Sequence, residues 1–265
     1  MAKTNTAVAP RNPKAGAVTS WEQQMAAAAQ DVAAAESKVG ASRFFSTRAG
    51  ILALGGNPLP DNRMDVVVLD SVFERAYYGG EAFDPENPKP PVCFAFSRTG
   101  DDMEPHDESQ EKQHEDCTNC PHNKWGTAER NDGKKSKGKA CKEIRRLGTI
   151  PSTALEDPKY VAQAEWGMLK VPVTSISGWA NYVKAVAASY KRPPFGMVTQ
   201  IALQPDVKTQ FRMTFQALDS IKNNTIGQAI LAKRDSILEE MVAPYQPKDE
   251  EEEAPKKPAA KRKFR

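Results

Sequence analysis

Cys93-Phe-Ala-Phe-Ser97 opens a stretch that continues through Cys117-Thr-Asn-Cys120-Pro-His-Asn-Lys-Trp-Gly126 to Gly138-Lys-Ala-Cys141 and holds all four cysteines of the chain. Two thiols separated by two residues can turn back onto one ion, and thiols from flanking segments can complete a tetrahedral shell that suits Zn²⁺. We therefore expect a zinc ion held by Cys93, Cys117, Cys120 and Cys141. Four thiolates leave no open position for activated water, so the expected role of the metal is structural.

Two alternatives stay open at this point. Reduced cysteines can serve simply as small apolar groups, although their clustering in a hydrophilic stretch favours a metal. The second alternative is that a histidine takes the place of Cys93 as a ligand. The candidates are His106, His114 and His122.

The segment from about residue 99 to 148 is hydrophilic and contains two charge blocks. Residues 101–116 carry eight acidic groups against one lysine, and residues 124–146 carry nine basic groups against three acidic ones. A positive field of this kind indicates a polyanionic partner. We expect the segment to be an insertion that gains its stability from the metal, because metal-binding free energy becomes folding free energy.

Strand patterns flank this insertion and resume only at residue 167. The expected strands cover residues 51–54, 65–69, 72–78, 92–97, 167–173, 197–203 and 210–218. Helical spacing predicts helices over 175–190 and 224–241. This order predicts a mainly β fold with accessory helices, namely an OB-fold-like β-barrel over residues 43–218 with an inserted zinc-binding loop.

The two ends of the chain have a different composition. We expect a disordered arm over residues 1–18, an alanine-rich helix over 19–40, a C-terminal helix over 222–243 and a charged disordered tail over 244–265. The sequence contains neither a signal peptide nor an apolar run of the roughly 20 residues that cross a membrane. A soluble intracellular protein with reduced thiols is expected.

Barrels of this type bind single strands by tracking the backbone with cations and stacking bases on aromatic rings. Each ring could instead be a core group, and each lysine a solvated surface group. The candidate nucleic-acid contacts are Arg43, Phe45, Arg48, Arg75, Tyr77, Phe94, Phe96, Trp125, Lys134, Lys135, Lys137 and Lys139. An enzyme is not expected, because the sequence has no glycine-rich phosphate loop, no nucleophile elbow and no His-Glu-x-x-His motif.

The motif Cys117-x-x-Cys120-Pro-His-Asn-Lys-Trp-Gly126, with the lysine- and glycine-rich run that ends at Cys141, resembles the zinc motif of single-stranded DNA-binding proteins of tailed bacteriophages. The order of strands and helices over about residues 43–218 is similar too. The resemblance implies an OB-fold that coats single-stranded DNA during replication, recombination and repair, with a structural zinc, in the cytoplasm of an infected bacterial host.

In such proteins an acidic C-terminal tail recruits replication or recombination proteins and competes with DNA. Here the acidic block Asp249–Glu253 is followed by the basic end Lys261-Arg-Lys-Phe-Arg265, which departs from that pattern. A second hypothesis from the sequence is a zinc-stabilised protein-interaction adaptor in phage transcription or assembly, which would use the alanine-rich helix and the tail.

Overall fold

A computed structural model of the chain describes residues 20–21, 24–25, 28, 43–80, 89–129 and 133–245. The chain divides into two compact units, Met1–Ala41 and Ser42–Arg265. In the first unit the described residues Trp21, Gln24, Met25 and Ala28 are helical, and most of the alanine-rich helix expected over residues 19–40 lies outside the described residues. The expected arm over residues 1–18 and nearly all of the expected tail lie outside the described residues.

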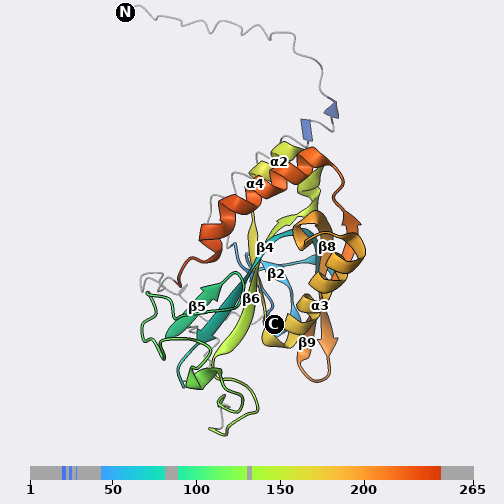
Figure 1. Ribbon diagram of the computed structural model, residues 1–265. Coiled ribbons are helices and arrows are strands. Elements are labelled where there is room, and N and C mark those ends of the chain that lie inside the picture. Colours follow the sequence, from blue (N-terminus) through green and yellow to red (C-terminus); the bar gives the residue numbers. More distant parts are fainter. Residues whose placement is uncertain are drawn as a thin grey trace, which may run out of the picture. The chain divides into compact units, whose positions relative to one another are not determined.

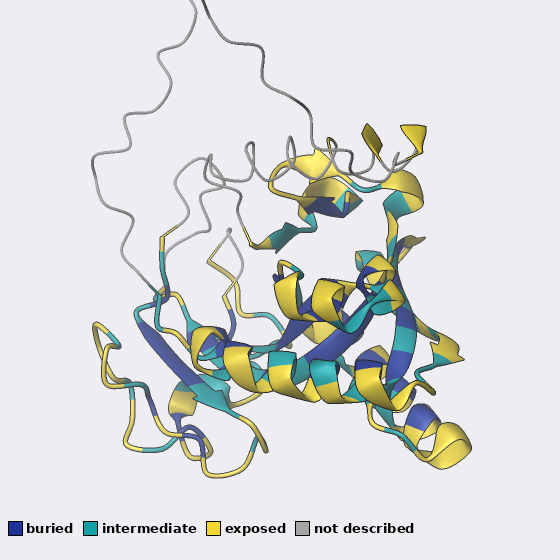
Figure 2. Ribbon diagram, turned by 90° about the horizontal axis from the view of Figure 1, so that it is seen from above, coloured by how far each residue is buried: buried dark blue, intermediate teal, exposed yellow. Residues whose placement is uncertain are grey.

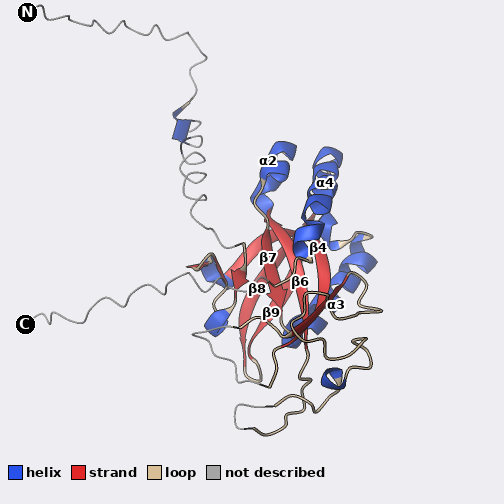
Figure 3. Ribbon diagram, turned by 90° about the vertical axis from the view of Figure 1, so that its left-hand side faces the viewer, coloured by secondary structure: helices blue, strands red, loops and turns tan. Residues whose placement is uncertain are grey.

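The second unit is built on one long strand, β4, and is mainly β with two antiparallel sheets (Figures 1 and 3). The larger sheet follows the order β7-β6-β4-β8-β9, and β5 pairs with β4 alone. Its strands are β4 (Arg63–Tyr77), β5 (Cys93–Ser97), β6 (Lys142–Pro151), β7 (Gly167–Val171), β8 (Met197–Asp206) and β9 (Gln210–Ser220). The smaller sheet contains β1 (Phe45–Ser46), β2 (Ala53–Leu54) and β3 (Asn57–Pro58).

The strand β4 has two successive neighbours on one edge. It pairs with β6 along most of its length, whereas its other edge pairs with β8 from Arg63 to Val66 and with β5 from Phe73 to Tyr77. Among the described residues β7 and β9 do not pair with each other, so the larger sheet is not a closed barrel.

In the described part of the second unit, three helices accompany the sheets, and both expected late helices are present. They are α2 (Pro158–Gln163), α3 (Val173–Tyr190) and α4 (Asn224–Met241), with 3₁₀ turns η1 (Arg48–Gly50), η2 (Pro60–Asn62), η3 (Pro121–Asn123), η4 (Ser152–Glu156) and η5 (Pro194–Gly196). The side chain of Asn223 caps α4 by accepting from the amides of Thr225 and Ile226. In the described part of the chain, no helix combines the length and the apolar character that crossing a membrane requires.

Each face of the larger sheet carries its own core, and the buried residues in Figure 2 concentrate on the strands. On the α3 face, Val66, Val68 and Leu147 pack with Trp179 and Val186 of the helix. On the α4 face, the core consists mainly of Val67, Leu69, Val72, Ile150 and Met168 with Ile226, Ile230, Ile237 and Met241 of α4. Burial on both faces explains why the run of valines in β4 is continuous rather than alternating.

The helix α3 lies against β9 and satisfies one of its backbone amides. The backbone amide of Met213 donates to the hydroxyl oxygen of Ser175 over 2.9 Å, and both residues are buried. An edge amide that would otherwise lack a partner is therefore satisfied by a helix side chain.

Replacing Ser175 with alanine should lower the free energy of unfolding by about 1–3 kcal/mol, because the buried amide of Met213 loses its acceptor. Chemical denaturation measures this loss. Ser189→Ala on the exposed side of the same helix serves as the control and should have little effect. Equal stabilities of the two variants would contradict the role assigned to Ser175.

Two expectations about the strands were wrong. The first is that strand structure resumes only at residue 167, since β6 occupies Lys142–Pro151. The second is the division of residues 65–78 into two strands, since β4 is continuous and has a register shift between Val68 and Asp70. Residues 98–141, which join β5 to β6, are called the cysteine insertion below.

Candidate functional site

The four cysteines lie around one small cavity of about 20 Å³ at the end of the sheet where β4, β5 and β6 meet. Cys93 begins β5 opposite Tyr77, and Cys141 immediately precedes β6, whose first residue Lys142 lies opposite Ala76. The antiparallel pairing therefore brings Cys93 and Cys141 to the same end of β4. Cys117 and Cys120 come from the loop between them and are buried.

The cysteine insertion places its pair of thiols through local backbone contacts. The amide of Cys117 donates to the carbonyl of Met103 over 2.8 Å, and the amide of Cys141 donates to the carbonyl of His122 over 2.9 Å. Pro121 begins the 3₁₀ turn η3 directly after Cys120. The chain therefore turns directly after Cys120, and this turn contacts Cys141 through the carbonyl of His122.

All four cysteines are free thiols. Burial, together with the neighbouring thiols and against the opposing effect of Arg75, raises the pKa of Cys117 to about 11 and that of Cys141 to about 12. These two thiols are therefore protonated at neutral pH in the arrangement described. Within the described ranges, no three Cys, His, Asp or Glu side chains are arranged to hold a metal ion.

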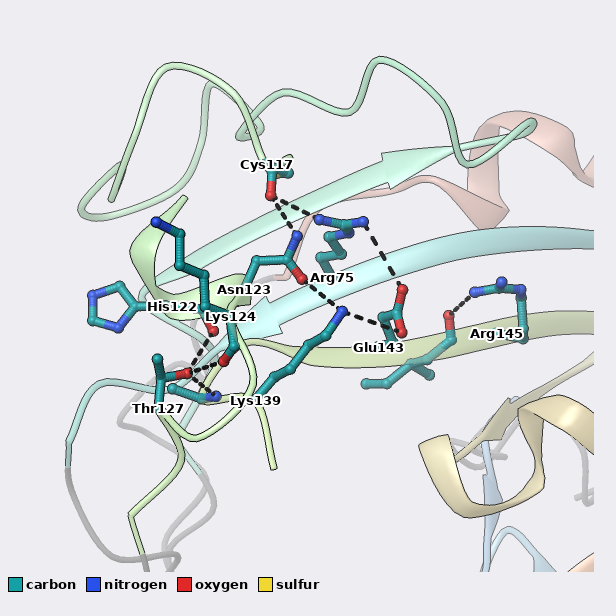
Figure 4. Close-up of polar contacts among 11 residues, drawn as sticks. Arg75, Cys117, His122, Asn123, Lys124, Thr127, Lys139, Glu143 and Arg145 are labelled. Carbon is teal, nitrogen blue, oxygen red and sulfur yellow. Dashed lines mark hydrogen bonds and ion pairs between the residues drawn. The ribbon is translucent and has the colours of Figure 1, made fainter. Parts of the chain in front are cut away.

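A closed polar network joins the cavity to β4 and β6 (Figure 4). The carbonyl oxygen of Cys117 accepts from Nη1 of Arg75 over 2.8 Å and from Nδ2 of Asn123 over 2.7 Å. Nζ of Lys139 donates to Oδ1 of Asn123 over 3.1 Å. The carboxylate of Glu143 lies 3.9 Å from both Arg75 and Lys139, which completes the network.

The same insertion presents an aromatic and basic surface to solvent. Trp125 is 72% exposed, and Nζ of Lys139 lies 5.3 Å from its ring centroid. Exposed lysines on this part of the chain are Lys124, Lys134, Lys135, Lys137 and Lys142. Cationic side chains around an exposed indole ring can bind a polyanion that also carries flat apolar groups.

Arg145 adds a cation on the strand itself. Its guanidinium carbon lies 3.5 Å from the ring centroid of Phe73, its partner across β4 and β6. Burial lowers its pKa, and its hydrogen bond goes to the adjacent carbonyl of Ile144. Among the described residues no carboxylate lies within ion-pair distance of it.

The predicted aromatic contacts Phe94 and Phe96 lie on the face of the sheet opposite to that of Arg75. Tyr245, the last described residue, lies against Phe94. Phe94 is 3% exposed, and its ring centroid lies 5.2 Å from that of Tyr245 and 5.0 Å from that of His106. The guanidinium of Arg146 lies 4.1 Å from the centroid of Phe96. In this arrangement other side chains of the protein occupy the faces of both rings.

A buried ionic cluster on that face was not predicted from the sequence. Glu74 is fully buried and accepts from Nε of Arg146 over 2.5 Å, from Nζ of Lys170 over 3.0 Å and from the hydroxyl of Tyr245. Arg146 also donates to the carbonyl of Met241, at the end of α4, over 3.0 Å. The cluster fastens the end of α4 to β4, β6 and β7.

The remaining predicted contacts have separate environments. Arg43 pairs with Glu240 of α4, and the half-buried ring of Phe45 lies beside Gly167. Arg48 is exposed on η1, and the ring of Tyr77 stacks on that of His122 with centroids 4.1 Å apart. The structure brings together Trp125 and Lys139, but it places Arg43 and Phe45 beside β7 and α4 instead.

Comparison with known proteins gives no match to a family model, to a curated protein or to a solved structure.

Proposed function

We propose that this protein binds single-stranded DNA without sequence preference, in phage DNA replication, recombination and repair, and that a structural zinc ion orders its binding loop. The observation that carries the proposal is the exposed ring of Trp125 with Lys139 over it, in a lysine-rich loop that is tied to the sheet beside four clustered cysteines. Stacking surfaces combined with cations bind single strands irrespective of their sequence.

The strand order supports an OB-fold as the framework. An OB-fold is a partly open five-stranded Greek-key barrel, and its first interstrand loop takes part in oligonucleotide binding. If β4, β6, β7, β8 and β9 are taken as its five strands, the observed path β7-β6-β4-β8-β9 leaves one seam open. The cysteine insertion then belongs to the first interstrand loop.

The donor set fits zinc in its chemistry. Cys93, Cys117, Cys120 and Cys141 would hold the ion, which supplies a cross-link between the insertion and the ends of β5 and β6. Binding requires the thiols to lose their protons and to close on the ion from the cavity wall. His114 and His122 line the same cavity, so a histidine in place of Cys93 stays compatible with the donor set.

The basic surface gives the proposal a characteristic salt dependence. Each phosphate neutralised on a single strand contributes about −0.7 to the slope of log affinity against log salt concentration. The candidates for these contacts are Lys124, Lys135, Lys137, Lys142 and Arg145. Binding should therefore be strong at low salt and weaken steadily as salt is added.

Replacing Trp125 with alanine should weaken oligonucleotide binding by about 1–3 kcal/mol, the contribution of one stacked base. Fluorescence anisotropy of a labelled thymidine oligonucleotide across a salt series measures the affinity, and elemental analysis of the same sample measures zinc. Tyr160→Ala, which removes an exposed ring from α2, is the matched control and should not change binding.

Equal affinity for duplex and single strand, or no binding at low salt, would refute the DNA-binding proposal. Absence of zinc from the purified protein would separately refute the metal. A stable protein partner together with no oligonucleotide binding would favour the adaptor function instead.

A further inference from the structure

We propose that Arg75 is the charge-balancing and positioning residue of the cysteine centre, and not one of the nucleic-acid contacts. The inference rests on the proposed zinc ion. The Arg75 side chain is 15% exposed, lines the cavity together with all four cysteines and donates to the carbonyl oxygen of Cys117 over 2.8 Å. These contacts direct its guanidinium inward, to the centre.

The charge of the centre gives Arg75 its role. Zn²⁺ with four thiolates carries a net charge of −2, and an excess charge in a buried site is costly unless opposite charge compensates it. Among the described residues that line the cavity, Arg75 is the only arginine or lysine. The one lining carboxylate, Asp116, accepts from the backbone and side chain of Asn119. Glu143 lies 3.9 Å from Arg75 and equally close to Lys139, so this one carboxylate is shared by two cations and the three groups keep a net positive charge.

The position of Arg75 in the sheet explains how it can reach the centre. It lies on β4, opposite Ala95 of β5 on one side and Glu143 of β6 on the other. The strands that carry or follow Cys93 and Cys141 therefore flank it directly. From this central place one side chain can contact the thiols that the two outer strands bring together.

The polar network adds a positioning role to the charge. Cys117 is the ligand candidate whose backbone Arg75 holds, and Asn123 holds the same carbonyl from inside the insertion. Glu143 lies near Arg75 and Lys139 at once. Arg75 thereby joins the loop of the paired thiols to β4 and β6, and through Lys139 to the exposed ring of Trp125.

Zinc affinity distinguishes this role from DNA contact. Zinc is titrated against a chromogenic chelator in wild-type protein and in Arg75→Gln, Arg75→Lys and Arg145→Gln, without DNA. We expect Arg75→Gln to bind zinc about 10–100-fold more weakly, as for other residues that support metal ligands. Arg75→Lys keeps the charge and should retain most of the affinity. Arg145→Gln should keep its zinc and lose oligonucleotide affinity.

Cobalt substitution provides a second readout that folding alone does not change. The visible absorption of Co²⁺ in a thiolate site should shift or weaken in Arg75→Gln and be restored in Arg75→Lys, in samples whose circular dichroism matches that of the wild type. Wild-type zinc affinity in Arg75→Gln, or equal losses in the two variants, would overturn the inference. If the wild-type protein contained no zinc, the proposed metal itself would be refuted, which is a separate result. If Arg75→Gln does not fold, loss of zinc from folded Arg75→Lys would also overturn it.

Discussion

Replacing Cys120 with serine is expected to abolish zinc binding and to unfold the cysteine insertion, while the two cores of the sheet stay folded. A hydroxyl is a poor substitute for a thiolate on zinc, and structural zinc contributes about 10–16 kcal/mol in small metal-dependent modules. Besides its hydrogen bonds and the polar network with Arg75 and Glu143, the insertion has only a small apolar cluster among the described residues. Met103 and Cys117 of the insertion pack there with Ala95 of β5 and Phe73 of β4.

Elemental analysis measures the loss of zinc, and limited proteolysis measures the unfolding of the insertion. The Cys120→Ser protein should contain no zinc and be cleaved between β5 and β6, and chelator-treated wild-type protein should give the same fragments. His106→Ala is a suitable control because His106 stacks on Phe94 and does not line the cavity. Full zinc content in Cys120→Ser would contradict the ligand assignment.

Replacing Glu74 with glutamine is expected to lower the free energy of unfolding by about 3–5 kcal/mol, because removing one partner of a buried ion pair leaves uncompensated charge. Two cations, Arg146 and Lys170, would lose their counter-charge. Denaturant unfolding measures the change. Glu239→Gln on the exposed side of α4 is the control and should be close to wild type.

The buried ion pairs of Glu74 also predict that the free energy of unfolding depends on pH. Burial by itself would raise the pKa of Glu74, but Lys170 and Arg146 outweigh it and hold the pKa below the ordinary value of 4.5. Because the folded pKa is depressed, this stabilisation is fully present above the unfolded pKa and is lost as pH falls through the folded pKa. Wild-type stability should decline below pH 4.5, and Glu74→Gln should lack that part of the decline. If the stabilities of the two proteins declined equally as the pH was lowered, the assignment would be contradicted.

Helices and late strands could be predicted because their apolar periods are uninterrupted. The prediction of 224–241 coincides with α4, and those of 175–190, 197–203 and 210–218 fall within α3, β8 and β9. In β4 the period breaks where the register shifts between Val68 and Asp70, and the polar Asp70-Ser71 pair then resembles a turn. An irregularity that neighbouring strands stabilise gives no clear local signal.

The strand β6 was missed for a different reason. Its buried positions include Arg146, Gly148 and Thr149, which do not form an apolar alternation. Arg146 is buried because Glu74 lies on the neighbouring strand, and a Cβ at Gly148 would meet the side chains of Ile237 and Met241. Both features depend on tertiary contacts, which the local sequence pattern does not reveal. The Asp157-Pro158 start of α2, by contrast, is a capping signal that could have been used.

For the site, the sequence predicts which side chains share a face but not what covers that face. Period two correctly separates Cys93 from Phe94 and Phe96. It gives no sign that Tyr245, from beyond α4, lies against Phe94, or that Arg75 turns to the cysteines. The convergence of the cysteines could be expected from spacing, whereas the network that joins Arg75, Glu143 and Lys139 depends on strand register.

The change of neighbours along β4 has a mechanical consequence. Beyond Val66 the strand leaves β8, and it meets β5 only at Phe73, so in between it is hydrogen-bonded to β6 alone among the described strands. Tension applied to the cysteine insertion would reach β8 and β9 mainly along the ladder of β4 and β6, which β7 extends on the far side of β6. The pull would run parallel to the strands, a direction in which the backbone hydrogen bonds bear the load together and do not open one at a time.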